Sequence, residues 1–391
     1  MGQVNITLAN GQIGGSLQTN DGIVGMVLTG TDEGSYTLGT PILLTSLTDL
    51  LANGITTAGN PFAYRQVKEF YDEAGIGSQL YLMLVDRTVR VNNMADYTNP
   101  NGASILLDFA AGKIKVLGIM SDDIACYPMS MPAIISGLSD DATAAISAMQ
   151  VMAEQYFNKQ WPFRAVIGGT TFSGSVDHLE DESIGTTYNR VAILVGDTQP
   201  GVNACLGLCL GRIASIPVQR KISRVRTGSL SNAAAYVGTI PVNSFADMNV
   251  IAQRGYITFK TYPNVSGYFF SGDDTASATT DDYHFLSRGR VIDKAHALAY
   301  ATFVQEVDDE ILVNADGTLD AGFCKWLSQQ MINQINSNMI AGKEISAVGC
   351  YIDPAQNILS TNQLNVILTI TPVGYASDIE VQLGFNNPAL S

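Results

Sequence analysis

Short apolar runs alternate with amphipathic helical segments along the first 235 residues, and this alternation constrains the fold more than any other feature of the sequence. Continuous apolar runs are typical of strands that are buried on both faces. Here such runs lie at residues 23–28, 79–85, 113–120, 164–167 and 190–195. Helical spacing of apolar residues separates them, at 60–75, 103–111, 139–156 and 202–214. Strands that alternate with helices predict an α/β layer with a mostly parallel sheet.

Capping signals mark the ends of two of these helices. Asn60 precedes Pro61, so we expect Asn60 at the N-cap, Pro61 in the first turn and Gly75 at the end of the helix. Ser139 stands before the longest helical stripe of this half and is a second predicted N-cap.

The character of the sequence changes after about residue 231. Two strands are predicted on either side of Pro263-Asn264, and they are followed by two long helices, at 291–307 and 318–341. Terminal strands then close the chain. The second half therefore reads as α+β. We predict an N-terminal arm at 1–20, an outer α/β region at 21–235, an inner α+β core at 236–375 and a C-terminal arm at 376–391.

Both ends of the chain carry a short strand pattern with nothing obvious beside it to pair with. Apolar and polar residues alternate around Val4, Ile6 and Leu8, and again around Ile379, Val381 and Leu383. An exposed strand must be covered, or it adds itself to another sheet. Two interpretations stay open: the ends complete the sheets of other copies and so build a polymer, or they are local edge strands of their own subunit.

Charge and composition exclude several classes of partner. The 391 residues include 21 Lys and Arg against 36 Asp and Glu, a net charge of −15. Nucleic acids and anionic membrane surfaces attract basic faces, so neither is an expected partner. No apolar run reaches the roughly 18–20 residues of a membrane span, and the first residues lack the pattern of a signal peptide. Five scattered cysteines are typical of reduced thiols in a cytoplasmic setting.

Catalytic and metal-binding patterns are mostly absent. The glycine-rich stretch 168–174 lacks the Lys-Ser/Thr ending of a phosphate loop, and the spacing of Gly207 and Gly211 matches no dinucleotide fingerprint. His178 and His284 stand near carboxylates, where a divalent cation or a solvated acidic loop are the alternatives. We therefore predict no catalytic residue, no cofactor and no metal. A soluble α/β enzyme or ligand-binding protein with an acidic cleft is the alternative function, and it requires convergent polar groups.

Several stretches resemble the contractile tail sheath family of bacteriophage tails and related bacterial injection systems. The resemblance lies in the order of the predicted elements and in short stretches of similar sequence, rather than in one motif. It covers 22–30, 41–50, 64–85, 250–259, 267–271, 283–310, 349–354 and 364–383. The middle, 89–229, has no close match, and the phrase after Gly267 is altered to Ser271-Gly272-Asp273-Asp274.

The resemblance implies a structural subunit rather than an enzyme. Sheath subunits form hexameric rings, stacked helically around an inner tube, and exchange strands with their neighbours. Contraction drives the tube through a target envelope. The implied partners are other copies, the inner tube protein, and baseplate and terminator proteins. The implied location is a virion tail or a cytoplasmic assembly in the bacterial producer cell. Tube or capsid components are a third class, which the length of the chain disfavours.

Within that expectation, residues can be assigned to roles. The arm strands are Val4, Ile6 and Leu8 and then Ile379, Val381 and Leu383. The receiving sheet comprises Ala347, Val348, Tyr351, Leu364, Val366, Leu368 and Ile370. Gly14, Gly15 and Gly374 are the predicted hinges, because glycine tolerates large backbone changes. Lys325 and Lys343 are the predicted tube-facing residues, and the acidic α/β half is expected to face outward.

Overall fold

The computed structural model describes residues 20–122, 133–172, 174–377 and 379–385. The chain divides into two compact units, Met1–Ile311 and Leu312–Ser391, which we call the N-terminal and C-terminal units. Predictions for Val4, Ile6, Leu8, Gly14 and Gly15 fall outside the described residues. The predicted domain boundaries at 20, 235 and 375 stay predictions.

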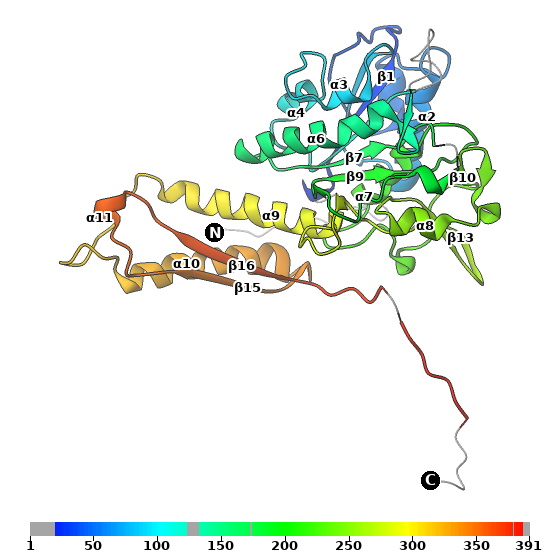
Figure 1. Ribbon diagram of the computed structural model, residues 1–391. Coiled ribbons are helices and arrows are strands. Elements are labelled where there is room, and N and C mark those ends of the chain that lie inside the picture. The colour runs from blue at the N-terminus through cyan, green and yellow to red at the C-terminus, as the bar shows by residue number, and fades with distance from the viewer. Residues whose placement is uncertain (1–19, 123–132, 173, 378, 386–391) are drawn as a thin grey trace, which may run out of the picture. The chain divides into compact units, whose positions relative to one another are not determined.

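A six-stranded sheet forms the centre of the N-terminal unit (Figure 1). Its strand order is β2-β3-β1-β4-β7-β9, and every pair is parallel except β2 with β3. The predicted parallel-rich α/β sheet is therefore confirmed. The strands are β1 (Val24–Gly30), β2 (Ile42–Leu44), β3 (Leu80–Asp86), β4 (Val116–Met120), β7 (Arg164–Gly168) and β9 (Val191–Leu194).

Helices cover this sheet. All residues of β1, β4, β7 and β9 are buried, so both faces of these strands are covered. α2 packs against α7, and α3 packs against α6. The helices of this layer are α1 (Leu47–Ala52), α2 (Pro61–Ala74), α3 (Val91–Ala95), α4 (Ser104–Ala110), α6 (Asp140–Asn158) and α7 (Leu206–Ala214).

The two predicted N-caps behave differently. Ser139 caps α6 as expected, because its hydroxyl accepts a hydrogen bond from the Ala142 amide at 3.2 Å. Asn60 does precede α2, but its side chain makes no capping bond. Its Oδ1 instead accepts from the Thr31 amide at 2.8 Å, and its Nδ2 donates to Glu33 at 2.9 Å. Asn60 thus joins α2 to the loop after β1. Gly75, with φ 84°, ends α2 as predicted.

Smaller elements complete the N-terminal unit. The predicted hairpin at Pro263-Asn264 is confirmed, with Asn264 in the left-handed region at φ 64°. Its strands are β12 (Phe259–Tyr262) and β13 (Val265–Phe270). The helix α8 (Met248–Gln253) precedes the hairpin in the chain, and α9 (Leu286–Phe303) follows it. Three short antiparallel pairs are β5 (Ile134–Ile135) with β6 (Leu138–Ser139), β8 (Thr187–Tyr188) with β14 (Ala276–Ser277), and β10 (Tyr236–Val237) with β11 (Ile240–Pro241).

A helix and a two-stranded antiparallel sheet form the C-terminal unit. The predicted helix at 318–341 is α10 (Ala321–Ile335), which continues as a π-helical turn, Asn336–Ile340. The Asp320 side chain caps α10 by accepting from the Phe323 amide at 2.8 Å. The sheet consists of β15 (Ile345–Ile352) and β16 (Val366–Pro372), joined through α11 (Ile358–Thr361).

The final run of alternating residues does not form a strand in the single chain. Residues 379–385 lie in no helix or strand. A strand needs a hydrogen-bonding neighbour, and the described part of this chain supplies none here. The predicted strand pairing with another copy stays a prediction. Across the described residues, no helix is both long and apolar enough to cross a membrane.

Candidate functional site

The β15–β16 sheet is the strongest candidate for a functional surface. Its register runs from Ile345 opposite Pro372 to Ile352 opposite Val366, with an irregularity between Ile345 and Ala347. Within the described ranges, each strand has one hydrogen-bonded neighbour, the other strand. Both outer edges of this pair therefore present unpaired backbone groups, which are templates for a further strand.

Only part of this hairpin is covered. α10 packs against β15, and it contributes the buried side chains of Leu327, Met331 and Ile335. Ile345 and Ile352, at the two ends of β15, are each 3% exposed. Two-stranded hairpins are marginally stable alone, and three or more strands or a packed helix are needed. α10 supplies one such support, and the open edges leave room for further strands.

The structure brings the predicted receiving residues together. Ala347, Val348 and Tyr351 lie on β15, opposite Thr371, Ile370 and Ile367 of β16. Val366, Leu368 and Ile370 lie on β16 and are half-buried, whereas Leu364 precedes the strand. The intervening residues of β16 point outward, as the alternation predicts.

One exposed apolar residue lies on β16, within the stretch Leu364 to Ile370 that was predicted to receive a strand. Ile367 is 59% exposed and lies opposite Tyr351, which is 56% exposed. Ile367 lies in a continuous apolar run, so the sequence pattern does not show that its side chain is exposed while those of Val366 and Leu368 are half-buried. The pair forms an apolar patch on an otherwise polar-facing side of the hairpin.

The C-terminal tail carries its apolar side chains in the open. Ile379 and Val381 are each 78% exposed, and Leu383 is 97% exposed. A β-carbon added to Gly374 would meet no atom within 4 Å, so the backbone between β16 and the tail is unconfined there. A row of alternate apolar residues without cover is what a donated strand would provide.

The two predicted tube-facing lysines are both exposed. Lys325 lies on α10, next to Trp326, which is 49% exposed. Lys343 lies between the π-helical turn and β15, with φ 57°. Their exposure agrees with a contact role, and the role itself stays a prediction.

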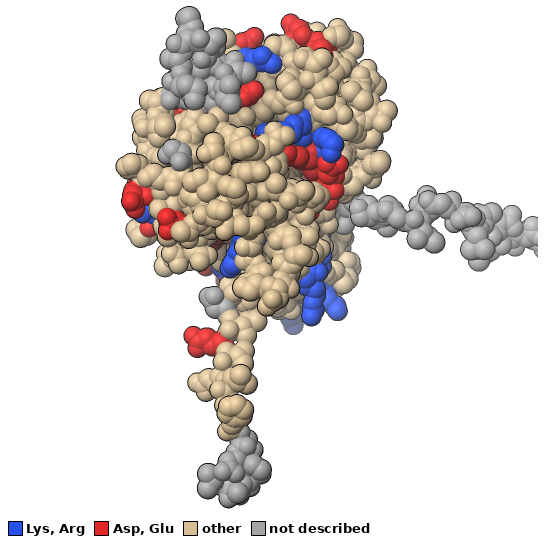
Figure 2. Space-filling view, turned by 90° about the vertical axis from the view of Figure 1, so that its right-hand side faces the viewer, with Lys and Arg blue, Asp and Glu red and all other residues tan. Residues whose placement is uncertain are grey.

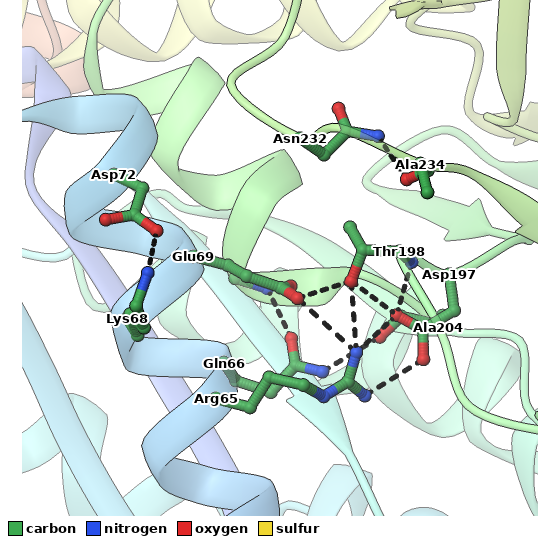
Figure 3. A network of polar contacts seen from close by, with 11 residues as sticks. Arg65, Gln66, Lys68, Glu69, Asp72, Asp197, Thr198, Ala204, Asn232 and Ala234 are labelled. Carbon is green, nitrogen blue, oxygen red and sulfur yellow. Dashed lines mark hydrogen bonds and ion pairs between the residues drawn. The ribbon is translucent and has the colours of Figure 1, made fainter. Parts of the chain in front are cut away.

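The N-terminal unit contains a polar network that an enzyme interpretation would have to use (Figure 3). Arg65 on α2 binds Asp197 through two hydrogen bonds, of 2.6 and 2.9 Å. Glu69 accepts a hydrogen bond of 2.5 Å from the Thr198 hydroxyl, and burial raises its pKa to about 7. Gln66 accepts from the Gly207 amide at 2.7 Å. The network ties α2 to the loop after β9 and to the start of α7, which is a structural task.

The described histidines lie among carboxylates and backbone carbonyls. His284 Nε2 lies 2.9 Å from Asp274 Oδ1, and its Nδ1 lies 2.9 Å from the Ser277 carbonyl. Asp273 is buried and accepts from the Ser287 amide at 3.0 Å. His178 is exposed on a short 3-10 turn. Among the residues that the structure describes, no three His, Cys, Asp or Glu side chains form a group that could hold a metal ion.

Solved structures with the same fold include contractile sheath proteins. The anti-feeding prophage (AFP) helical sheath in its contracted state matches with a TM-score of 0.64 at 12% identity, over 98% of this chain and 99% of that one. The contracted sheath of PVC, an extracellular contractile injection system, matches with a TM-score of 0.60 at 11% identity, over 99% of this chain and 98% of that one. A chain of the AFP baseplate also matches, with a TM-score of 0.60 at 12% identity, over 99% of each chain.

Family models cover nearly the whole sequence, whereas no curated protein matches it. The model of the DUF2586 N-terminal domain matches residues 1–274, and that of the DUF2586 C-terminal domain matches residues 282–390. The chain therefore belongs to the DUF2586 family, and its fold is that of contractile sheath proteins.

Proposed function

We propose that this protein is the structural subunit of a contractile tail sheath, which polymerises helically around an inner tube by exchanging strands between copies. The observation that carries the proposal is the β15–β16 hairpin, which has two open edges and lies in the same unit as an uncovered apolar tail. The fold shared with the AFP and PVC sheaths supports it.

In this proposal, each copy lends two arms to its neighbours. Residues 1–20 donate the strand at Val4, Ile6 and Leu8, and residues 376–391 donate the strand at Ile379, Val381 and Leu383. A strand of about five residues forms several backbone hydrogen bonds, each contributing roughly 0.5–1.5 kcal/mol. One arm alone is a weak link. Two arms engaged together gain avidity, and glycines at 14, 15 and 374 let them swing during contraction.

The wider assembly follows from the same proposal. Copies form hexameric rings, the core at 236–375 lies inward and the α/β region faces outward. Lys325 and Lys343 contact the inner tube, while baseplate and terminator proteins occupy the ends. The chain acts without catalysis or cofactor. It is located in a virion tail or in a cytoplasmic assembly of the bacterial producer cell.

Truncation of the arms tests this function. Full-length protein should form rods, rings or cogwheels by electron microscopy, and deletion of residues 1–10 or 376–391 should block them while the subunit stays folded by circular dichroism. A matched control replaces Glu380 and Gln382 with Ser, which leaves the alternate apolar residues in place and should preserve assembly. Normal tubes from either truncation would refute the arm assignment. A stable monomer from the full-length chain would refute the function.

A further inference from the structure

Three arginines on the loop at 220–226 and one in the first turn of α9 form no ion pair among the residues that the structure describes. We call Arg220, Arg224, Arg226 and Arg288 the basic cluster; none of them forms an ion pair among the described residues. Burial, with a further contribution from the charge of Arg224, lowers the pKa of the Arg220 guanidinium. Arg220 and Arg224 therefore lie within electrostatic reach of each other.

The ring of Phe285 joins the loop that carries three of these arginines to the helix that carries the fourth. The Lys221 ammonium lies 3.1 Å from the Phe285 ring centroid, and the Arg288 guanidinium lies 5.1 Å from it. Lys221 also forms an ion pair with Asp273, in which Nζ lies 3.5 Å from Oδ1. Cation–π contacts of this kind fix the loop at 220–226 beside the first turn of α9.

Four carboxylates occupy the other end of the same helix. We call Glu306, Asp308, Asp309 and Glu310 the acidic cluster; it follows the 3-10 turn that extends α9. Asp308, Asp309 and Glu310 are exposed, and Glu306 is half-buried. Within the described residues, none of the four forms an ion pair.

Neither cluster stabilises the helix that separates them. A helix favours negative charge at its N-terminus and positive charge at its C-terminus, and α9 has the reverse arrangement. Figure 2 shows that charged side chains on one face of the molecule form separate small groups, with much uncharged surface between them.

The two clusters are too far apart to meet within one copy. α9 is a single uninterrupted helix of 18 residues (Figure 1), so at about 1.5 Å per residue it is about 27 Å long. Screening in about 0.1 M salt acts over roughly 10 Å. The opposite charges of these two clusters therefore do not satisfy each other within one copy.

We propose that the basic cluster of one copy binds the acidic cluster of the next, head to tail. This inference rests on the proposed function, since it takes a second copy as the partner. A chain with a net charge of −15 presents mostly repulsive surfaces to its own copies, and a cationic patch matched to an anionic one directs where two copies approach. Contacts between two different patches propagate as an open helix, unlike a closed twofold dimer.

Paired charge reversals test the contact. Variant A carries Arg220→Glu, Arg224→Glu and Arg226→Glu, and variant B carries Asp308→Lys, Asp309→Lys and Glu310→Lys. Each variant alone presents like charges at the contact, so self-association measured by sedimentation velocity should weaken about tenfold or more. An equimolar mixture of A and B places opposite charges at every contact and should associate as wild type does.

A control separates this effect from a change of net charge. Arg87→Glu, Lys113→Glu and Lys260→Glu together give the same net charge as variant A, but the reversals lie outside the basic cluster, so association should stay near that of wild type. Thermal unfolding of every variant verifies that the subunit is folded. Higher salt should weaken wild-type association and leave the folded subunit intact.

The outcomes distinguish this inference from the proposed function. If wild type forms helical polymers and A and B each do so equally well, the charge contact is refuted and the sheath function stands. If A fails alone and mixing with B does not rescue it, the basic cluster binds a different anionic surface and the proposed pairing is overturned. If wild type forms no polymer, the sheath function fails, while association of A with B in solution still decides the pairing.

Discussion

The sheets of the two units differ in how their edge strands are covered. In the N-terminal unit, the outermost strand β9 is continued by the backbone of Ile257, which accepts from the Val195 amide at 2.8 Å and donates to the Ile193 carbonyl at 2.8 Å. The other edge is β2, a strand of three residues. In the C-terminal unit, β15 and β16 extend over eight and seven residues and leave both edges open in the described chain.

This difference separates a sheet whose edges are short or continued by other backbone from a sheet whose edges are open in the described chain. The N-terminal unit buries the strands of its sheet beneath its own helices, so we expect its stability to depend on internal packing. In the described part of the C-terminal unit, α10 and the π-helical turn after it pack against β15, so we expect a partner that binds the open edges to raise the stability of this unit by mass action. The following experiments test this contrast, in order of decreasing expected effect.

The largest effect should come from breaking the buried ion pair of the N-terminal unit. Arg164 is 1% exposed, and its guanidinium binds Asp293 of α9 at 2.7 and 3.1 Å. Asp293→Ala leaves this charge buried and uncompensated, which should lower the free energy of unfolding by about 3–5 kcal/mol. Urea denaturation measures the loss.

Asp72→Ala is the matched control for that prediction. Asp72 pairs with Lys68 on the exposed face of α2, where both side chains are about half exposed. Exposed pairs contribute about 0–1 kcal/mol, so the control should barely move the transition. Equal losses in the two variants would show that burial of the Arg164 pair does not matter.

The contact between α2 and α7 should be nearly as sensitive. A β-carbon added to Gly207 would lie 1.8 Å from the Gln66 carbonyl oxygen, which is fixed backbone. Gly207→Ala must force the helices apart, so a loss of about 2–3 kcal/mol is expected. At Gly201 a β-carbon would meet no atom within 4 Å, and Gly201→Ala should be neutral. Thermal melts that coincide for the two variants would contradict this close packing.

The pH dependence of the N-terminal unit should show an effect of intermediate size. Glu69 has a pKa of about 7 in the fold against an ordinary value of 4.5. Between these pH values the native state keeps a proton that the unfolded state has released, so stability falls as pH rises. Glu69→Gln should flatten this slope. Between pH 4.5 and 7, the free energy of unfolding should fall by about 1–2 kcal/mol less in the variant than in wild type. Denaturation at several pH values measures the slope. An unchanged slope in Glu69→Gln would show that another group causes the pH dependence. Glu182, whose pKa is also about 7, would then be the next residue to substitute.

The smallest effect on subunit stability should come from the open face of the hairpin. Ile367→Ser alters a side chain that is 59% exposed, so unfolding should shift by no more than about 0.5 kcal/mol, while polymer formation is impaired. Ile352→Ala, on the opposite strand, removes a side chain that is 3% exposed and should destabilise the C-terminal unit. Limited proteolysis and electron microscopy separate the two results. A folded Ile367→Ser variant that assembles normally would show that this face stays free in the polymer.

Much of the fold was predictable because the signals are local. Uninterrupted apolar runs predicted β1, β3, β4, β7 and β9, and the helical spacing after Ser139 predicted α6. The hairpin β15–β16 was also anticipated from its sequence. These patterns depend on residues close together in the chain, which periodicity detects.

Other features depend on what lies opposite, and sequence patterns do not contain that information. Gly207 and Gly211 fail the dinucleotide fingerprint, and their role emerges only when α2 is seen against α7. Asn60 has the right position for a cap, but Thr31 and Glu33 compete for its side chain. The arginines at 220–226 are plain in the sequence, whereas their place beside the first turn of α9 is not. The proposed arm strands would pair with another copy, so the structure of one chain does not define them.

The open edges of the β15–β16 hairpin also make a free copy of this protein prone to aggregation. Any extended peptide, including the same segment of a misfolded copy, can use an unpaired strand edge, which is how aggregates begin. Pro372 ends β16 and lacks an amide hydrogen, so that edge offers one donor fewer to an intruding chain. In the proposed sheath, capture of a newly made copy by its neighbours would cover these edges, so we expect assembly to protect the protein from such contacts.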